Sequence, residues 1–195
     1  SESNPFCIWN SAQKIFLSSL DSIIKKERMR LELDEVLLSL VERYRENEAF
    51  LAKLLTLPSE EELTVHMLNY EQFVEPEAVF MAIEKLNRFF SEILEDKLDN
   101  LYTSIKVEDD EIGPRNAGKR RLKNRFLDFI TYLDKDAFQS KQCFEKSPNM
   151  TEILHSLKLL VKTGNGHEAL QKFYTTWKKD QLLLDKWFSI QAIYT

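Results

Sequence analysis

The amino-acid sequence predicts an all-α protein in which antiparallel helix pairs stack as an armadillo/HEAT-like α-superhelix. Apolar residues recur at steps of three and four along most of the chain, which is the period of a helix with one buried face. Only 4 Gly and 5 Pro occur in 195 residues, so long helices and short loops are expected. Strand-like alternation of apolar and polar residues is absent. We expect residues 1–195 to form a single domain, since this length suits one well-filled core.

The first three helices follow from apolar spacing and from residues that begin or end a helix. The spacing predicts a helix over 5–26. Asp34 precedes the next apolar run, and we expect it to cap a second helix that reaches Tyr44. A third helix is predicted over 49–55, because Pro58 cannot continue it.

The middle of the chain carries two clear helix starts. In "LPSEEEL", Ser59 and Glu62 have the spacing of a capping box. In "VEPEAVF", Pro76 suits the first helical turn. The apolar stripe that follows extends to Leu101, about eight turns at 3.6 residues per turn. This is the longest helix that the sequence predicts.

The loop "KVEDDEIGPRNAG" ends that helix, and the next is expected from Lys119 to Leu133. In "SPNMTEIL", Asn149 and Glu152 again have capping-box spacing. The helix that they begin is expected to end at Gly164 in a left-handed conformation. Two further helices close the chain, at 167–178 and 181–193.

Charge and cysteine content exclude several classes of protein. The net charge of −5 disfavours partners such as nucleic acid or an anionic membrane, because phosphate binding needs a positive field. No apolar run is long enough to span a bilayer. The two cysteines, Cys7 and Cys143, are too few for a disulfide framework and indicate a reducing, cytoplasmic compartment. We expect both to be buried as small apolar side chains.

One short stretch begins like a zinc-peptidase motif. His167 and Glu168 open "HEALQ", but H-E-x-x-H requires a second His where this chain has Gln171. The other histidines, His66 and His155, lie in different segments. We therefore predict no metal ligand and no cofactor-binding residue in this chain, and expect His167 to be solvated in the first turn of a helix.

Two other patterns are better explained by ordinary surface chemistry. "GPRNAGKR" matches G-x-x-x-x-G-K, but Arg120 stands where a phosphate loop needs Ser or Thr, and no buried strand precedes it. The basic cluster at 119–125 follows four carboxylates at 108–111, which favours a locally neutralised surface. A nucleophile motif such as G-x-S-x-G is absent. We therefore predict no catalytic residue. The aromatic residues of the last two helices are expected to pack in a core: Phe173, Trp177, Trp187 and Phe188.

Five segments, in order along the chain, resemble the C-terminal helical domain of the bacterial aminopeptidase N type of zinc metallopeptidase. "NPFCIWNSAQKIF" resembles the opening of that domain, and "LPSEEEL" with "VEPEAVFMAIEKL" resembles its Leu-Pro-Ser-Glu stretch and Asp-Pro helix start. "AGKRRLKNRFLDFI" resembles its Gly-Arg-Arg-x-Leu-Lys-Asn helix, and "NMTEIL" its Asn-Met-Thr-Asp turn. "LDKWFSIQA", within "NGHEALQKFYTTWKKDQLLLDKWFSIQA", is close to identical with the family pattern.

The resemblance implies a parent enzyme that removes N-terminal amino acids from peptides. Its zinc is held by H-E-x-x-H and a distant Glu, and a Gly-x-Met-Glu-Asn motif binds the free amino group. Neither motif lies in this chain, so zinc is expected only in the catalytic domain of the parent. The helical domain of that family is a bowl-shaped superhelix that covers the active site and restricts entry, and its chain continues past the position of Ala192. Arg120 and Arg121 fall in the matching motif, which makes them candidates for the substrate channel or the domain interface, with bracing of the fold as the alternative.

Two hypotheses follow from the sequence. The first is a non-catalytic helical domain of a zinc aminopeptidase, with the catalytic domain of the same chain and the peptide substrates as its partners. The second is a free-standing helical-repeat module that binds a protein. A chain that begins at Ser1 without Met and ends on an apolar stripe is typical of a piece of a larger protein, which favours the first hypothesis.

Overall fold

The computed structural model describes residues 4–27, 32–71, 73–107 and 113–194. Within these residues the chain forms ten helices and no strand, which confirms the all-α prediction. The helices are α1 Pro5–Ile24, α2 Leu33–Tyr44, α3 Glu48–Leu54, α4 Glu60–Met67, α5 Pro76–Ser104, α6 Pro114–Leu133, α7 Phe138–Lys146, α8 Met150–Lys162, α9 His167–Trp177 and α10 Gln181–Tyr194. None of the described helices is long and apolar enough to cross a lipid bilayer.

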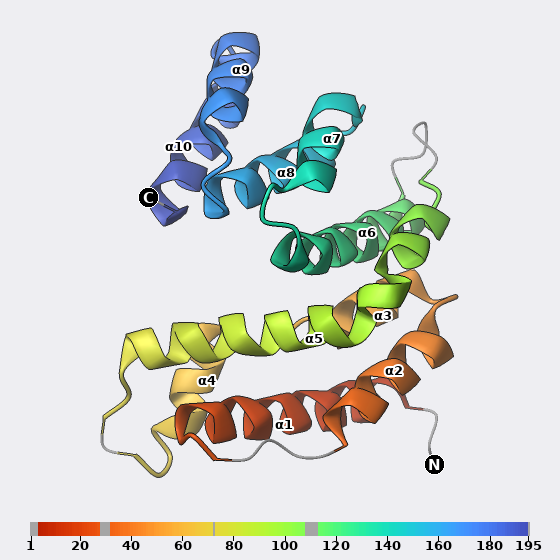
Figure 1. Cartoon of the computed structure of the whole chain (residues 1–195), viewed down its shortest axis with the longest axis vertical. Helices are drawn as coiled ribbons and strands as arrows, with labels where there is room; N and C mark the ends of the chain where they lie inside the picture. The colour runs from red at the N-terminus through yellow and green to blue at the C-terminus, as the bar shows by residue number, and fades with distance from the viewer. Residues whose placement is uncertain (1–3, 28–31, 72, 108–112, 195) are drawn as a thin grey trace.

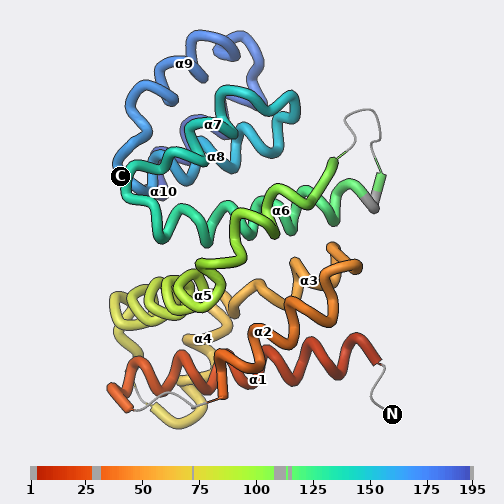
Figure 2. The backbone as a smooth tube through the Cα atoms, turned by 45° about the vertical axis from the view of Figure 1, so that its right-hand side comes forward, coloured from red at the N-terminus to blue at the C-terminus, as the bar shows by residue number. Residues whose placement is uncertain are grey.

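The helices succeed one another along the long axis of the molecule. Figure 1 shows α1 at one end, α5 and α6 in the middle, and α9 with α10 at the other end. α5 packs on both α1 and α6, and α8 packs on α6, α7, α9 and α10. The turned view in Figure 2 shows the same succession of levels. The chain is therefore a stack of packed helix pairs, as the apolar spacing predicts.

A ladder of phenylalanine rings joins the first levels of the stack. Phe16 of α1 contacts Phe90 of α5 edge to face, with ring centroids 5.3 Å apart. Phe90 also contacts Phe129 of α6, with centroids 6.3 Å apart. All three side chains are fully buried. They lie in one apolar core that is built almost entirely from α1 to α6.

A second core holds the last four helices together. Phe144 of α7 and Phe173 of α9 are its buried aromatic side chains, and Leu157 of α8 is buried in the same core. Trp177 and Trp187 pack against this core, as predicted, but are only partly buried. Phe188 is 57% exposed, so the prediction that it is a core residue is wrong.

Most of the predicted helix boundaries are confirmed. Ser59 and Glu62 form the predicted capping box at the start of α4, Pro76 occupies the first turn of α5, and Gly164 has φ of +75° after α8. Asp34 lies inside the first turn of α2 and caps nothing, because α2 already begins at Leu33.

Four local predictions differ from the structure, three of them for identifiable reasons. α6 begins at Pro114 rather than Lys119, because proline fits the first helical turn and the glycine inside the helix is tolerated. α7 escaped prediction, since a nine-residue helix is too short to show a clear period. Glu152 does not complete a capping box with Asn149. Its carboxylate instead accepts a hydrogen bond of 2.9 Å from the Ser147 hydroxyl. Cys143 is buried as predicted, but Cys7 is exposed.

Candidate functional site

A cleft of about 630 Å³ opens between the α3–α4 turn and the face of α6. Its volume lies in the range of about 300–1,000 Å³ that small-ligand sites occupy. Five elements supply its walls, so side chains that are distant in the sequence meet there. The lining residues are Ala52, Thr56, Leu57, Pro58, Ser59, Glu60, Glu61, Ile83, Asn87, Arg121, Asn124, Arg125, Asp128 and His155.

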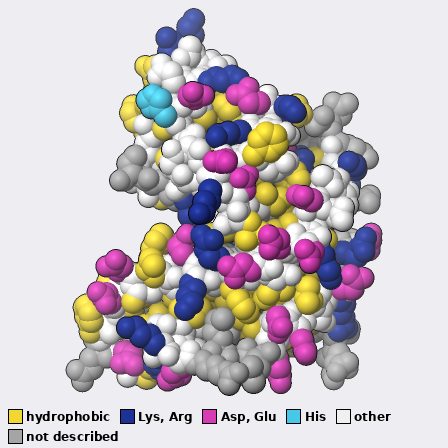
Figure 3. Space-filling model, in the orientation of Figure 1, with side chains coloured by type: hydrophobic (Ala, Val, Ile, Leu, Met, Phe, Trp, Pro, Cys, Tyr) yellow, Lys and Arg dark blue, Asp and Glu magenta, His cyan; other side chains and the backbone are white. Residues whose placement is uncertain are grey.

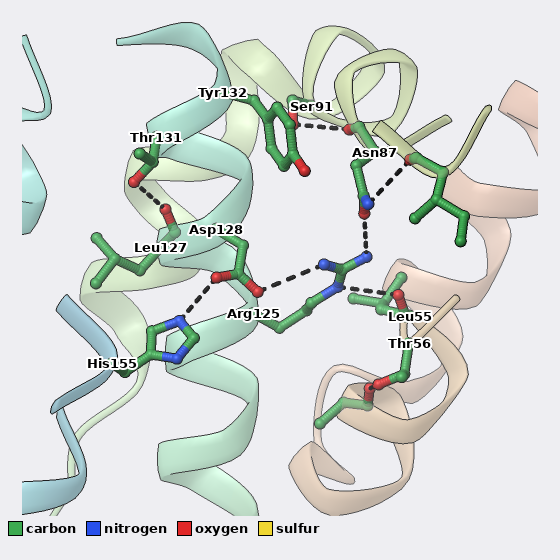
Figure 4. Close-up of polar contacts among 12 residues, drawn as sticks. Leu55, Thr56, Asn87, Ser91, Arg125, Leu127, Asp128, Thr131, Tyr132 and His155 are labelled. Atoms are coloured by element: carbon green, nitrogen blue, oxygen red, sulfur yellow. Dashed lines mark hydrogen bonds and ion pairs between the residues drawn. The ribbon is translucent and has the colours of Figure 1, made fainter. Parts of the chain in front are cut away.

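Arg125 fixes the walls of this cleft relative to one another. Its Nε donates a hydrogen bond of 3.0 Å to the Leu55 carbonyl at the end of α3. One terminal nitrogen donates to Asn87 Oδ1 of α5 at 2.7 Å, and the other lies 3.4 Å from Asp128 Oδ2. Figure 4 shows the guanidinium reaching from α6 to Leu55 at the end of α3 and to Asn87 on α5, beside Asp128 on α6 itself. A planar, five-donor group is suited to such bridging.

Asp128 is shared between Arg125 and His155. Its second carboxylate oxygen lies 2.7 Å from His155 Nε2, which connects α6 to α8. Burial by itself would raise the pKa of Asp128. The hydrogen bond with His155 and the electrostatic attraction of His155 and Arg125 outweigh burial and lower this pKa below its ordinary value. The carboxylate is therefore held in its ionised form.

A second polar cluster ties α5, α6 and α8 together beside the cleft. Lys162 Nζ lies 2.6 Å from Glu84 Oε1 and 2.8 Å from the Tyr132 hydroxyl. The same hydroxyl donates to Glu84 Oε1 at 2.8 Å. Burial, followed by the hydrogen bond to Glu84, raises the pKa of Tyr132, so the phenol stays protonated and keeps donating.

Of the two arginines that the sequence singles out, Arg121 lines the cleft. Arg121 is exposed and lies one helical turn before Arg125, on the same face of α6. Arg120 is half-buried and is not part of the cleft wall. Neither guanidinium forms an ion pair with any residue in the described part of the chain. The structure thus separates the pair: one arginine faces the cleft and its neighbour faces elsewhere.

Sequence reasoning missed the residues that brace the cleft. Asn87 and His155 give no local signal, because their partners in the cleft lie 38 and 27 positions away. The spacing of Arg125 and Asp128, three residues apart on one helix, was a hint of an ion pair. In the sequence His155 was considered only as a second zinc ligand, and it lies in a different segment from His167. In the structure it is paired with the carboxylate of Asp128.

The patterns that resembled zinc and nucleotide sites have other roles. His167 is exposed in the first turn of α9, as predicted. The segment that matches a phosphate loop is helical from Pro114 onward, so it forms no loop around a phosphate. Among the described residues, no three His, Cys, Asp or Glu side chains are placed to hold a metal ion.

The basic cluster at 119–125 is partly neutralised. Its acidic partners lie on α6 itself and on α8. Lys123 lies 3.5 Å from the buried carboxylate of Glu152, and Arg125 pairs with Asp128. The carboxylates at 108–111, which the sequence offers as partners, lie outside the described residues. Figure 3 shows basic and acidic side chains interspersed on the face in view.

The comparisons with known proteins agree with one another. Aminopeptidase N of Haemophilus influenzae is 28% identical over 199 residues, which cover 97% of this chain and 22% of that protein. Aminopeptidase N of Escherichia coli is 24% identical, with the same coverage of 97% and 22%. The matched region is the C-terminal part of these relatives. The chain thus spans about a fifth of their length.

Solved structures show the same fold. The crystal structure of Legionella pneumophila aminopeptidase A in complex with aspartic acid matches 98% of this chain and 24% of that chain, with a TM-score of 0.81 and 24% identity. The model of a family described as a domain of unknown function with ARM repeats, DUF3458_C, matches residues 1–195. That match covers every residue of the sequence and agrees with the stacked helices described above. The chain belongs to the DUF3458_C family of ARM-repeat domains.

Proposed function

We propose that this chain is a non-catalytic part of the C-terminal helical domain of a cytoplasmic zinc aminopeptidase that releases N-terminal amino acids from peptides. The observation that carries the proposal is the match of 97% of the chain to proteins named Aminopeptidase N, of which it covers only 22%. In this proposal residues 1–195 form one domain. Its partners are the catalytic domain of the same polypeptide and the peptide substrates. Zinc is assigned in this proposal to that catalytic domain, where the family resemblance places the H-E-x-x-H motif.

The role proposed for the helical stack is to cover the active site and restrict access to it. A stack of helix pairs offers an extended surface that a second domain or a peptide can follow. Arg121 is proposed to line the substrate path from the cleft, and Arg120 to lie at the domain interface. The unpaired state of both guanidinium groups among the described residues supports these roles, since each is available to a partner.

The first test is the length and composition of the native polypeptide. Mass mapping of the native protein is expected to yield an upstream peptide with H-E-x-x-H in a chain several times longer than 195 residues. The isolated 195-residue chain is expected to bind no zinc and to hydrolyse no aminoacyl amide. Stoichiometric zinc or co-purifying activity in the isolated chain would contradict its non-catalytic role.

A second test addresses access. In the full-length enzyme, Arg121→Glu is expected to change kcat/KM for peptides and to leave kcat/KM for a single aminoacyl amide unchanged. In this proposal a peptide extends from the active site to the cleft, whereas an aminoacyl amide is too short to reach it. Equal effects on both substrates would argue for a structural role of Arg121 rather than one in the substrate path.

The alternative function is a free-standing protein-interaction module. Leu182, Phe188 and Ile193 of α10 are 57% to 76% exposed, and such a contact surface fits a neighbouring domain of the same polypeptide as well as a separate protein. A native product of about 23.0 kDa without a catalytic portion would favour this alternative over the aminopeptidase.

A further inference from the structure

The cleft has the build of a binding site rather than of an accidental gap. Its lining combines the apolar side chains of Ala52, Leu57, Pro58 and Ile83 with polar side chains from α4, α5, α6 and α8. A lining that combines apolar surface with polar groups is typical of sites that recognise a ligand. The walls are fixed before any ligand arrives, because Arg125 joins α3, α5 and α6. Such pre-organisation lowers the entropic cost of binding.

The charges of Arg125 and Asp128 in the cleft are already compensated. The donors of Arg125 are directed to Leu55, Asn87 and Asp128, and the carboxylate of Asp128 is shared with His155. These groups hold one another and have little capacity left for a ligand. They form the frame of the site rather than its recognition groups.

The groups that remain available are Arg121 and Asn124 on the α6 wall. Arg121 has no ion-pair partner and Asn124 has no hydrogen-bond partner among the described residues, and both line the cleft. A guanidinium binds a carboxylate through two parallel hydrogen bonds, and a primary amide can donate to and accept from a peptide backbone. Together they match an extended peptide segment with a carboxylate.

The other wall limits how much negative charge a ligand can carry. Glu60 and Glu61 stand at the start of α4, and neither forms an ion pair with a described residue. Two carboxylates in the same cleft repel a polyanion. A phosphate or a run of acidic residues is therefore disfavoured, whereas one carboxylate beside a neutral backbone is tolerated.

We propose that this cleft binds a peptide segment with a single carboxylate, which Arg121 holds while Asn124 contacts the backbone of the segment. The carboxylate belongs to an Asp or Glu side chain or to a C-terminus. Two sources share this chemistry: a free peptide, or a segment of the parent polypeptide itself. Only the choice of source rests on the proposed function, since recognition of the carboxylate depends on this chain alone.

The test uses the 195-residue chain and two probes, acetyl-Ala-Leu-Asp-amide and its uncharged isostere acetyl-Ala-Leu-Asn-amide, titrated by calorimetry or NMR. The Asp peptide is expected to bind at least ~10-fold more tightly, the scale of one charge-assisted interaction. Arg121→Gln is expected to abolish this preference. Arg120→Gln is the matched control and is expected to keep it, because Arg120 lies outside the cleft wall.

A further variant checks the opposite wall. The double substitution Glu60→Gln and Glu61→Gln is expected to tighten binding of the Asp peptide by removing the repulsion. Circular dichroism confirms that each variant remains folded. Absence of binding, equal binding of the Asp and Asn peptides, or an equal effect of Arg120→Gln and Arg121→Gln would overturn the proposal.

The full-length enzyme distinguishes the two sources. If free peptide is the ligand, the Asp probe binds the full-length enzyme and Arg121→Gln weakens that binding. If a segment of the parent polypeptide is the ligand, the full-length enzyme excludes the probe, and Arg121→Gln lowers its thermal stability without affecting the isolated chain. Should the native polypeptide lack an aminopeptidase portion, the proposed function fails, while the titrations of the 195-residue chain still decide the carboxylate site.

Discussion

Asp128 shows how a single residue holds the cleft in shape. One carboxylate oxygen is hydrogen-bonded to His155 and the other is paired with Arg125. Asp128 therefore connects α6, which forms the cleft wall, to α8. About a fifth of its side chain is exposed, at 22%, so solvent screens these interactions only in part. The ionised carboxylate holds Arg125 and His155 in position.

The substitution Asp128→Asn is expected to lower the free energy of unfolding at pH 7 by about 2 kcal/mol, the scale of hydrogen bonds to a charged group. The pKa of this carboxyl is lowered on folding. Its contribution is therefore present in full above the ordinary pKa of about 3.9 and is lost as pH falls through the lower folded value. Urea unfolding at several pH values should show the wild-type and variant curves converging below about pH 4.

Glu46→Gln is the control for this prediction. Glu46 pairs with Arg45 at 3.4 Å, but its side chain is 92% exposed, so its removal should leave stability almost unchanged. A difference between wild type and Asp128→Asn that stays constant from pH 7 to acid would contradict the role of the ionised carboxylate.

At Lys26, in contrast, a substitution is expected to raise the free energy of unfolding. It has φ of +57° just after α1, and the backbone N–H groups of Lys26 and Glu27 bond to Ile23 and Ser22, the pattern of a Schellman motif. Lys26→Gly should raise the free energy of unfolding by about 0.5–1 kcal/mol, because glycine adopts this conformation without strain. Lys25→Gly, at φ of −73°, should lower it. Denaturant unfolding of both variants decides this, and a loss of stability in Lys26→Gly would refute it.

At the scale of helices, the packing of α6 on α3 depends on one missing side chain. A Cβ added to Gly118 would lie 2.7 Å from Ala49 Cβ and 3.0 Å from Ala49 Cα. The helices approach this closely only because residue 118 is glycine, despite the lower helix propensity of glycine. The same approach brings Arg121 and Arg125 alongside the α3–α4 turn.

Gly118→Ala is expected to destabilise the protein by about 1–3 kcal/mol, the usual cost of overpacking. In an isolated helix the same change would be stabilising by about 1 kcal/mol. Gly113→Ala is the control, since no atom lies within 4 Å of its added Cβ. Thermal unfolding measures both changes, and a stable Gly118→Ala protein would show that α3 and α6 can separate without cost.

The whole molecule is held by two apolar cores of unequal size. The larger joins α1 to α6 around the phenylalanine ladder, and the smaller joins α7 to α10. Between them lie Glu84, Tyr132 and Lys162 and the contact of Asp128 with His155. The two cores are therefore connected across a layer that is partly polar.

A chain cut after residue 134 tests this division. Residues 1–134 are expected to unfold cooperatively by themselves, because they contain nearly all of the larger core. Residues 135–195 are expected to lack a cooperative transition, since about 60 residues bury too little surface to be stable alone. Circular dichroism melts of the two fragments measure this. Cooperative unfolding of the second fragment would show that the smaller core is self-sufficient.

The sequence by itself determined the helices, because helix formation depends on local features. The apolar period, the capping box at Ser59 and the proline at 76 each lie within a few residues of the structure that they cause. The order of five short motifs also sufficed to indicate the aminopeptidase family, since it does not require knowing which residues touch. The helix start at Pro114 and the helix α7 were missed where the local signal was weak.

Only the tertiary structure decided what the cleft contains and which of the two arginines faces it. Leu55, Asn87, Arg125 and His155 belong to different helices, and their meeting depends on how α3, α5, α6 and α8 cross. Crossing geometry is set by side-chain packing at contacts such as Gly118 with Ala49. Such contacts join residues tens of positions apart, so no local pattern in the sequence records them.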